Sequence, residues 1–189
     1  MKKRLIALAT IFCLLLAAVP AGASSYLPQS AQPGGPVPGY MTFTAMASSE
    51  YKLKYNKEYQ VNASMAVDGN LITAWNEGAP GPGVGEWIML MPTDGNTYTY
   101  QGFQIANGFQ YEHYPKGDRW TMNNRVKYLQ VTDDCGNFIG NFLIQDIRDG
   151  YQVFFFSQPV TTRFLKFQIM SVWLGNTHPE ACISELKPF

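Results

Sequence analysis

Short apolar segments with a two-residue alternation are the feature that most limits what this chain can fold into. From residue 41 onward they recur at regular spacing between Gly- and Pro-containing turns, and none keeps the period of an amphipathic helix. Apart from one helical turn at 62–66, we expect strands at 41–46, 86–91, 100–106, 125–132, 138–144, 151–156, 163–172 and 182–187. These segments predict an all-β fold, a β-sandwich of about eight antiparallel strands.

The residues before this pattern differ from it in composition. Lys2, Lys3 and Arg4 form a basic start, followed by an apolar run at 5–19 and the small-residue site Ala-Gly-Ala at 21–23. This order is typical of an export signal, and the run is short for a membrane span. We therefore expect a signal peptide at 1–23, a Pro/Gly-rich linker at 24–39 and one domain at 40–189, in a secreted, extracellular protein.

Charge and motif content narrow the classes of function. The 14 Lys and Arg residues balance the 14 Asp and Glu residues, so no basic face for nucleic acid is indicated. Neither a Gly-x-Ser-x-Gly elbow nor a His-Glu-x-x-His zinc motif is present. Glu77 and Glu86 could serve a glycosidase, but they flank a Gly/Pro-rich loop and we interpret them as carboxylates that anchor it. We expect a binding protein and not an enzyme.

Two cysteines, Cys135 and Cys182, remain beyond the expected signal peptide. In an exported protein they could form a disulfide. The sequence does not tell whether the fold brings their Cα atoms within bonding distance, so both the paired and the free state stay open.

The turn at residues 66–75 concentrates oxygen-bearing side chains. Asp68, Asn70 and Thr73 follow one another closely, and Gly69 allows the backbone to bend so that carbonyls point inward. Such a set suits a hard cation such as Ca²⁺, which prefers several oxygen ligands on a stiff loop. The same residues also fit a simple Asx-turn followed by a buried Trp75. The turn alone leaves both interpretations open.

A second informative stretch, residues 107–120, is rich in aromatic and forked polar side chains. We expect a long loop there, and long loops of this composition are commonly functional. Sugars stack their C–H faces on aromatic rings while Arg, Asn, Asp, Glu or His hold the hydroxyl groups. The candidate glycan-binding residues are Tyr111, His113, Tyr114, Arg119 and Trp120. At least one of Tyr111, Tyr114 and Trp120 is expected to cover the end of the sandwich instead of binding a sugar.

Several motifs together resemble a known family. The turn Ala66-Val67-Asp68-Gly69-Asn70 with Thr73 and Trp75, and the closing Ile183-Ser184-Glu185-Leu186, resemble the discoidin (factor five/eight type C) family. The segments at 75–78, 83–88, 102–108 and 124–127 resemble a bacterial branch of it, the discoidin-like glycan-binding domain of NAD glycohydrolase translocation regions. The resemblance spans about residues 43–186, nearly the whole domain.

This resemblance implies a jelly-roll β-sandwich whose chain ends lie together. It also implies a structural Ca²⁺ beneath the 66–75 turn. The implied ligands are the side chains of Asp68 and Thr73, together with Asn70. Backbone carbonyls near Met65 and Ser184 and the Glu185 carboxylate complete the implied set. A second carboxylate from the far end of the chain would supply charge that the turn alone lacks. The ion's role would be to join the two ends of the domain.

The resemblance also implies a function. Glycan binding in such modules lies in the loops at one end of the sandwich, so we expect a non-catalytic carbohydrate-binding module with glycans or glycoconjugates as partners. The alternative is a discoidin-type module that binds protein or an anionic membrane surface, because eukaryotic relatives present apolar loop tips to lipid.

Overall fold

The computed structural model describes residues 41–52, 61–113, 115, 117–148 and 150–189. The expected signal peptide and linker, Tyr114 and the side chain of His113 lie outside the described part of the chain. Within that part, no helix is long and apolar enough to cross a membrane.

The eight expected strands are all present. They are β1 (Phe43–Ala47), β3 (Trp87–Pro92), β4 (Tyr98–Asn107), β7 (Asn124–Thr132), β8 (Phe138–Leu143), β9 (Gln152–Thr162), β10 (Leu165–Trp173) and β11 (Ala181–Pro188). The described residues also form η1 (Ala63–Ala66), which is the expected helical turn, α1 (Arg119–Met122), and the strands β2 (Trp75–Asn76), β5 (Glu112–His113) and β6 (Gly117–Asp118). These three strands have two residues each, too few to leave an alternation in the sequence.

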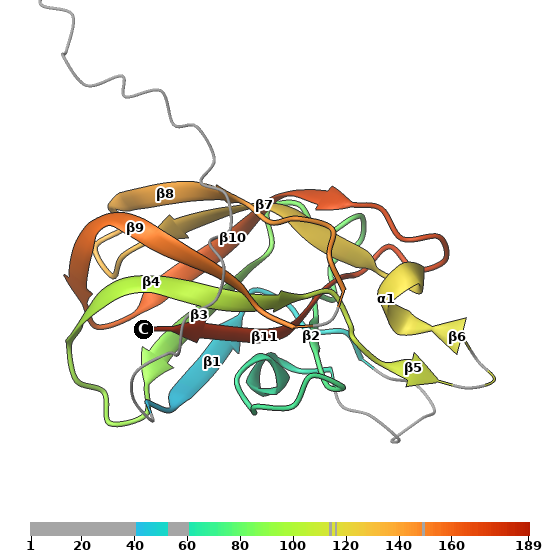
Figure 1. Cartoon of the computed structure of the whole chain (residues 1–189), viewed down its shortest axis with the longest axis horizontal. Helices are drawn as coiled ribbons and strands as arrows, with labels where there is room; N and C mark the ends of the chain where they lie inside the picture. The colour runs from blue at the N-terminus through green and yellow to red at the C-terminus, as the bar shows by residue number, and fades with distance from the viewer. Residues whose placement is uncertain (1–40, 53–60, 114, 116, 149) are drawn as a thin grey trace, which may run out of the picture.

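The strands form a β-sandwich, which confirms the predicted fold class. Along the main sheet the order is β1-β3-β10-β7-β11-β4-β9, with β2 beside β11 and β8 beside β7. Neighbours are antiparallel except for a short parallel pairing of β11 with β7. The sheet folds over so that β4 and β9 face β8 and β10 across the core (Figure 1).

Aromatic side chains fill the space between the two layers. The ring of Phe103 on β4 lies 5.0 Å from that of Phe142 on β8 and 5.2 Å from that of Phe167 on β10, centroid to centroid. Phe154 on β9 stacks on Phe103 at 5.1 Å. All four are fully buried, and each contributes about 2 kcal/mol by leaving water. Alternation along the strands directs these rings inward and polar neighbours outward.

The two cysteines do not pair. Cys135 is exposed in the turn between β7 and β8, whereas Cys182 is buried in β11, and both are free thiols. The possibility of a disulfide that the sequence left open is therefore not realised in this structure.

The stretch at 107–120 is more ordered than the single long loop that we expected. After β4 ends at Asn107, β5 and β6 form a small hairpin and α1 begins at Arg119. The Asp118 carboxylate accepts a hydrogen bond from the Trp120 backbone N–H at 3.2 Å and so caps α1. The expectation of a loop was wrong here because these elements are too short to show a period.

Candidate functional site

The turn at 66–75 and β11 together form a carboxylate-lined pocket. Glu185 Oε1 accepts hydrogen bonds from the backbone N–H groups of Gly69 at 2.8 Å and Asn70 at 3.1 Å. The Thr73 hydroxyl lies 2.9 Å and 3.0 Å from the two carboxylate oxygens of Asp68 and 2.7 Å from the carbonyl oxygen of Asn70. The fold thus brings Asp68, Thr73 and Glu185 together across most of the domain, as the family resemblance implied.

This pocket brings the carboxyl groups of Asp68 and Glu185 close together, with Lys187 also in its lining. Burial raises the pKa of Glu185 to about 7, and the neighbouring Asp68 carboxyl adds to the effect. The hollow beside them is about 270 Å³ in volume, and Gln104 and Tyr151 also line it. Two carboxylates with a hydroxyl and backbone carbonyls nearby are the ligand types that Ca²⁺ prefers. The residues present therefore fit a calcium ion.

The other implied ligands are placed as follows. The Asn70 side-chain oxygen accepts a hydrogen bond from the Ile72 N–H at 3.3 Å, and its backbone N–H donates to Asp68 at 2.9 Å. The turn is thus also an Asx-turn, and Trp75 after it is fully buried. Met65 lies in η1, which packs against β11, and Ser184 directly precedes Glu185 in that strand.

Glu77 and Glu86 hold backbone segments in place. Glu77 is fully buried and accepts hydrogen bonds from the N–H groups of Ala79 at 2.8 Å and Ala181 at 3.2 Å. Burial raises the pKa of Glu77. Glu86 accepts hydrogen bonds from the hydroxyl groups of Ser48 and Ser49. These contacts agree with the interpretation of both residues as loop anchors.

The second candidate region lies at the end of the sandwich where β4 ends, on the right in Figure 1. We call it the aromatic end and define it by residues 108–113, 117–123, 144–148 and 173–180. Tyr111 is half-buried there, stacked on Phe109 with ring centroids 5.9 Å apart. Trp120 is also half-buried, and its ring lies over the guanidinium group of Arg125, 4.5 Å from ring centroid to Cζ. Both rings therefore combine a structural contact with a partly exposed surface.

Polar side chains surround these rings. Arg119 Nη1 lies 3.3 Å from His178 Nε2, and the segment that carries His178 docks on α1 through its backbone N–H, 2.8 Å from the Met122 carbonyl oxygen. Arg148 forms ion pairs with Asp118 at 3.0 Å and Glu112 at 3.8 Å. The fold thus brings the predicted Tyr111, Arg119 and Trp120 to one end, together with the backbone of His113 in β5.

Sequence reasoning missed His178, Arg125 and Asp146 at this end. His178 stands between Thr177 and Pro179, a sequence typical of a turn, and lies far from the aromatic stretch in the chain. The pairing of β10 antiparallel to β7 brings it there, since the end of β10 meets the start of β7. The sequence does not show which strands pair, so it could not place His178 at this end. The one available signal was the residue type, since a histidine ring can donate and accept hydrogen bonds.

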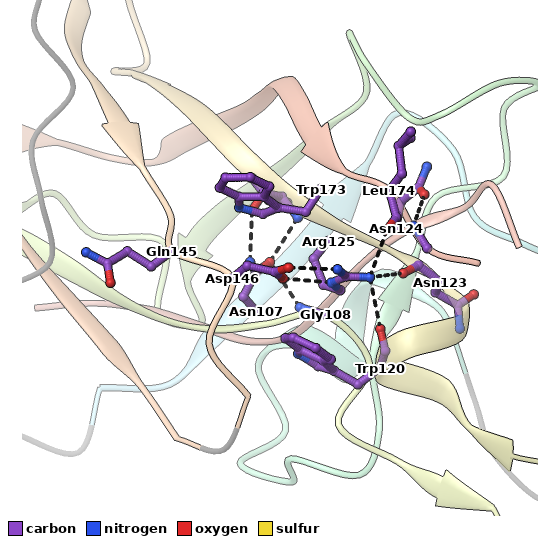
Figure 2. A network of polar contacts seen from close by, with 12 residues as sticks. Asn107, Gly108, Trp120, Asn123, Asn124, Arg125, Gln145, Asp146, Trp173 and Leu174 are labelled. Atoms are coloured by element: carbon purple, nitrogen blue, oxygen red, sulfur yellow. Dashed lines mark hydrogen bonds and ion pairs between the residues drawn. The ribbon is translucent and has the colours of Figure 1, made fainter. Parts of the chain in front are cut away.

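Arg125 connects the segments of the aromatic end. Its side chain is buried and forms two parallel hydrogen bonds with the Asp146 carboxylate, from Nε and Nη2, both at 2.9 Å. Figure 2 shows the Asp146 carboxylate on one side of the guanidinium group, backbone carbonyls on the other and the Trp120 ring nearby. Arg125 therefore lies at the centre of the polar network of this end.

Solved structures share this architecture. The family 32 carbohydrate-binding module of NanJ from Clostridium perfringens, in complex with galactose, matches with a TM-score of 0.54 and 18% identity over 77% of this chain and 92% of that chain. CpGH89CBM32-5 from the same organism, in complex with GalNAc-β-1,3-galactose, matches with a TM-score of 0.50 and 22% identity over 78% and 94%. A pectin-binding module matches with a TM-score of 0.52 and 14% identity over 79% and 90%. At these identities the similarity establishes the fold.

A comparison with curated proteins finds no match. The family model described as the NAD glycohydrolase translocation F5/8 type C domain matches residues 39–188, which is nearly the whole domain. The match covers the carboxylate-lined pocket and the aromatic end alike. This chain belongs to the family of NAD glycohydrolase translocation F5/8 type C domains.

Proposed function

We propose that this domain is a non-catalytic carbohydrate-binding module that recognises glycans at its aromatic end. The observation that carries the proposal is the position of Tyr111 and Trp120, which are half-buried beside the polar pair Arg119 and His178. The fold itself is that of modules solved in complex with galactose and with GalNAc-β-1,3-galactose.

The chemistry of these side chains suits a sugar. A partly exposed ring held on one side by the protein offers a flat apolar surface for the C–H face of a pyranose. Arg119 supplies several N–H donors in a fixed plane, and the His178 ring can donate from one nitrogen and accept at the other. Alternating hydroxyl groups of a sugar require this mixture of donors and acceptors close to a ring.

The proposal includes no reaction. Glu77 and Glu86, the two carboxylates that a glycosidase could use, are engaged by backbone N–H and seryl donors that hold loops in place. Binding is therefore the activity that we assign to the domain.

We also propose that Ca²⁺ stabilises the domain at the carboxylate-lined pocket. Asp68, Thr73 and Glu185 would hold it, with backbone carbonyls near Met65 and Ser184 and the Asn70 residue completing the set. The ion would neutralise two carboxylates that the fold holds close together. Its role would be structural, joining the 66–75 turn to β11.

An array of defined glycans tests the binding proposal, with galactose and GalNAc-β-1,3-galactose as the first soluble probes. Trp120→Ala and Tyr111→Ala are expected to weaken binding about tenfold or more, because each removes one stacking surface. Tyr98→Ala is the matched control, since Tyr98 is also a half-buried aromatic residue but begins β4, at the opposite end of the strand. Equal binding by all four proteins would contradict the proposal.

One observation favours the second candidate, binding to an anionic membrane surface. Leu174, in the segment after β10, is 73% exposed, and Ile147 in the neighbouring segment is 50% exposed. Apolar side chains at loop tips are typical of modules that insert into lipid. Sedimentation with phosphatidylserine vesicles, lost in Leu174→Ser, together with a blank glycan array would support this candidate. Binding to sugars without vesicle binding would exclude it.

A further inference from the structure

We infer that Arg125 is the positioning residue of the aromatic end: its guanidinium group holds the ring of Trp120 in the orientation in which the ring receives a ligand. This inference rests on the proposed function, since it assigns a role within the same site. Arg125 itself is only 6% exposed and is not assigned a contact with the glycan.

Several contacts fix the orientation of the Arg125 guanidinium group. Two parallel hydrogen bonds of 2.9 Å to Asp146 fix its plane. Asp146 belongs to the segment that follows β8, and its side chain is one-third exposed. The pair therefore ties β7 to that segment, with the Arg125 side chain facing inward.

The remaining nitrogen of Arg125 binds backbone carbonyls from two other segments. Nη1 lies 3.3 Å from the carbonyl oxygen of Trp120, 3.0 Å from that of Asn123 and 3.3 Å from that of Leu174. The first two belong to α1 and its C-terminal cap, a helix too short to hold itself in place. One side chain thus connects α1, the segment after β10 and the segment after β8 (Figure 2).

The Trp120 ring is held by two surfaces. Arg125 Cζ lies 4.5 Å from the ring centroid, a cation–π geometry. Gly108 packs beside both residues, so closely that a Cβ built on it would lie 2.6 Å from Arg125 Cγ and 2.8 Å from Trp120 Cδ1. The ring consequently has little freedom to turn, and its exposed part keeps one orientation.

Lysine cannot replace Arg125 in this role. An ammonium group has no plane to stack on the indole and cannot bind a carboxylate through two parallel N–H groups while reaching three carbonyls. Arg125→Lys keeps a positive charge opposite the partly exposed Asp146 carboxylate. The substitution therefore tests the planar shape of the guanidinium group and its hydrogen bonds, while the positive charge is kept.

The experiment measures the indole N–H resonance of Trp120 by NMR alongside glycan binding and thermal unfolding. Trp120 Nε1 is buried and has no acceptor within the described residues, so its resonance reports the packing around the ring, and Trp120→Phe assigns it. In Arg125→Lys we expect this resonance to shift and array binding to fall about tenfold. Arg163→Lys is the matched control, since Arg163 is exposed, and it should change neither.

An unshifted Trp120 resonance in Arg125→Lys would overturn the inference, whatever happens to binding. Should Arg125→Lys fail to fold, Asp146→Asn replaces it, because it leaves Arg125 in place and weakens only the pair that orients it. A shifted resonance in that variant supports the inference and an unshifted one overturns it. Should the unaltered protein bind no glycan, the proposed function fails, while a shifted resonance in Asp146→Asn, which keeps the guanidinium group beside the ring, still supports the positioning of Trp120 by Arg125.

Discussion

At the residue scale, Glu185 shows how the fold changes the chemistry of one carboxyl group. It is 4% exposed in the central strand β11 and lies beside Asp68. Burial and this neighbour disfavour its charged form, whereas the N–H groups of Gly69 and Asn70 favour it. The net result is a pKa of about 7 in place of 4.5, so the Glu185 carboxyl group is partly protonated in the folded state near neutral pH.

This pKa predicts how stability depends on pH when divalent cations are removed. Because the folded-state pKa of Glu185 exceeds the ordinary value, the folded state binds the proton more tightly than the unfolded state. The stabilisation is complete below the ordinary pKa and is lost as pH rises through about 7. It amounts to about 3 kcal/mol at most, so in chelator the Tm should be higher at about pH 5 than at about pH 8.

Thermal melts of Glu185→Gln in chelator provide the control. The amide cannot titrate, so this variant should lose most of the pH dependence. Glu77, whose pKa is also raised by burial, leaves a smaller dependence in the same direction. An unchanged pH dependence in Glu185→Gln would contradict the assignment to Glu185.

At the scale of elements, the aromatic end depends on very short pieces of secondary structure. β5, β6 and α1 comprise two, two and four residues, and none would form alone in water. Asp118 caps α1, Arg148 pairs with Asp118 and Glu112, and Arg125 binds the end of α1. Side-chain contacts from neighbouring segments therefore hold these elements in place.

Gly108→Ala tests the packing that links β4 to these elements. Gly108 has a φ of +71° and no room for a Cβ beside Arg125 and Trp120. We expect this substitution to lower the free energy of unfolding by about 3 kcal/mol, from the left-handed backbone and the steric overlap together. Urea denaturation measures the loss.

Gly136→Ala separates the cost of the left-handed backbone from the cost of steric overlap. Gly136 has a φ of +80° in the turn after β7, and nothing lies within 4 Å of a Cβ built there. Only the backbone effect of about 1 kcal/mol should remain in that variant. Equal losses at the two glycines would show that packing against Arg125 and Trp120 contributes nothing.

At the scale of the whole molecule, β11 holds the two ends of the domain together. It lies between β7 and β4, pairs also with β2, and carries Glu185 to the 66–75 turn near the start of the domain. A cation at the carboxylate-lined pocket would add a further connection between segments far apart in the chain, since Gly69 and Glu185 are 116 positions apart. Cross-links over long loops restrict the unfolded chain most.

We therefore expect calcium to raise the Tm and chelator to lower it. Asp68→Ala should abolish this difference, because it removes one of the two carboxylates. Asp94→Ala is the matched control: Asp94 likewise accepts hydrogen bonds within a turn, from Asn96 and Tyr98, but lies outside the pocket. A melt of the unaltered protein that is the same in calcium and in chelator would exclude the ion.

The sequence predicts the longer strands of this protein better than it predicts the candidate site. The eight longer strands were predictable because each spans enough residues for alternation to appear, as in β3, where Ile88 and Leu90 are buried and Trp87 and Met89 are partly exposed. The hairpin β5–β6 and α1 were not predictable, since capping and ion pairs define them and not periodicity. The proximity of Asp68 to Glu185 was implied only by the family resemblance, and in the structure both residues line the same pocket.

The sequence by itself determined the eight longer strands, the tight 66–75 turn and the family, because these depend on local spacing and on residue types in fixed order. Only the tertiary structure decided which loops meet. The antiparallel pairing of β10 with β7 brings His178 beside Arg119, and the fold places Asp146 opposite Arg125. Those contacts join residues far apart in the chain, and their energies depend on burial and distance, neither of which a linear pattern contains.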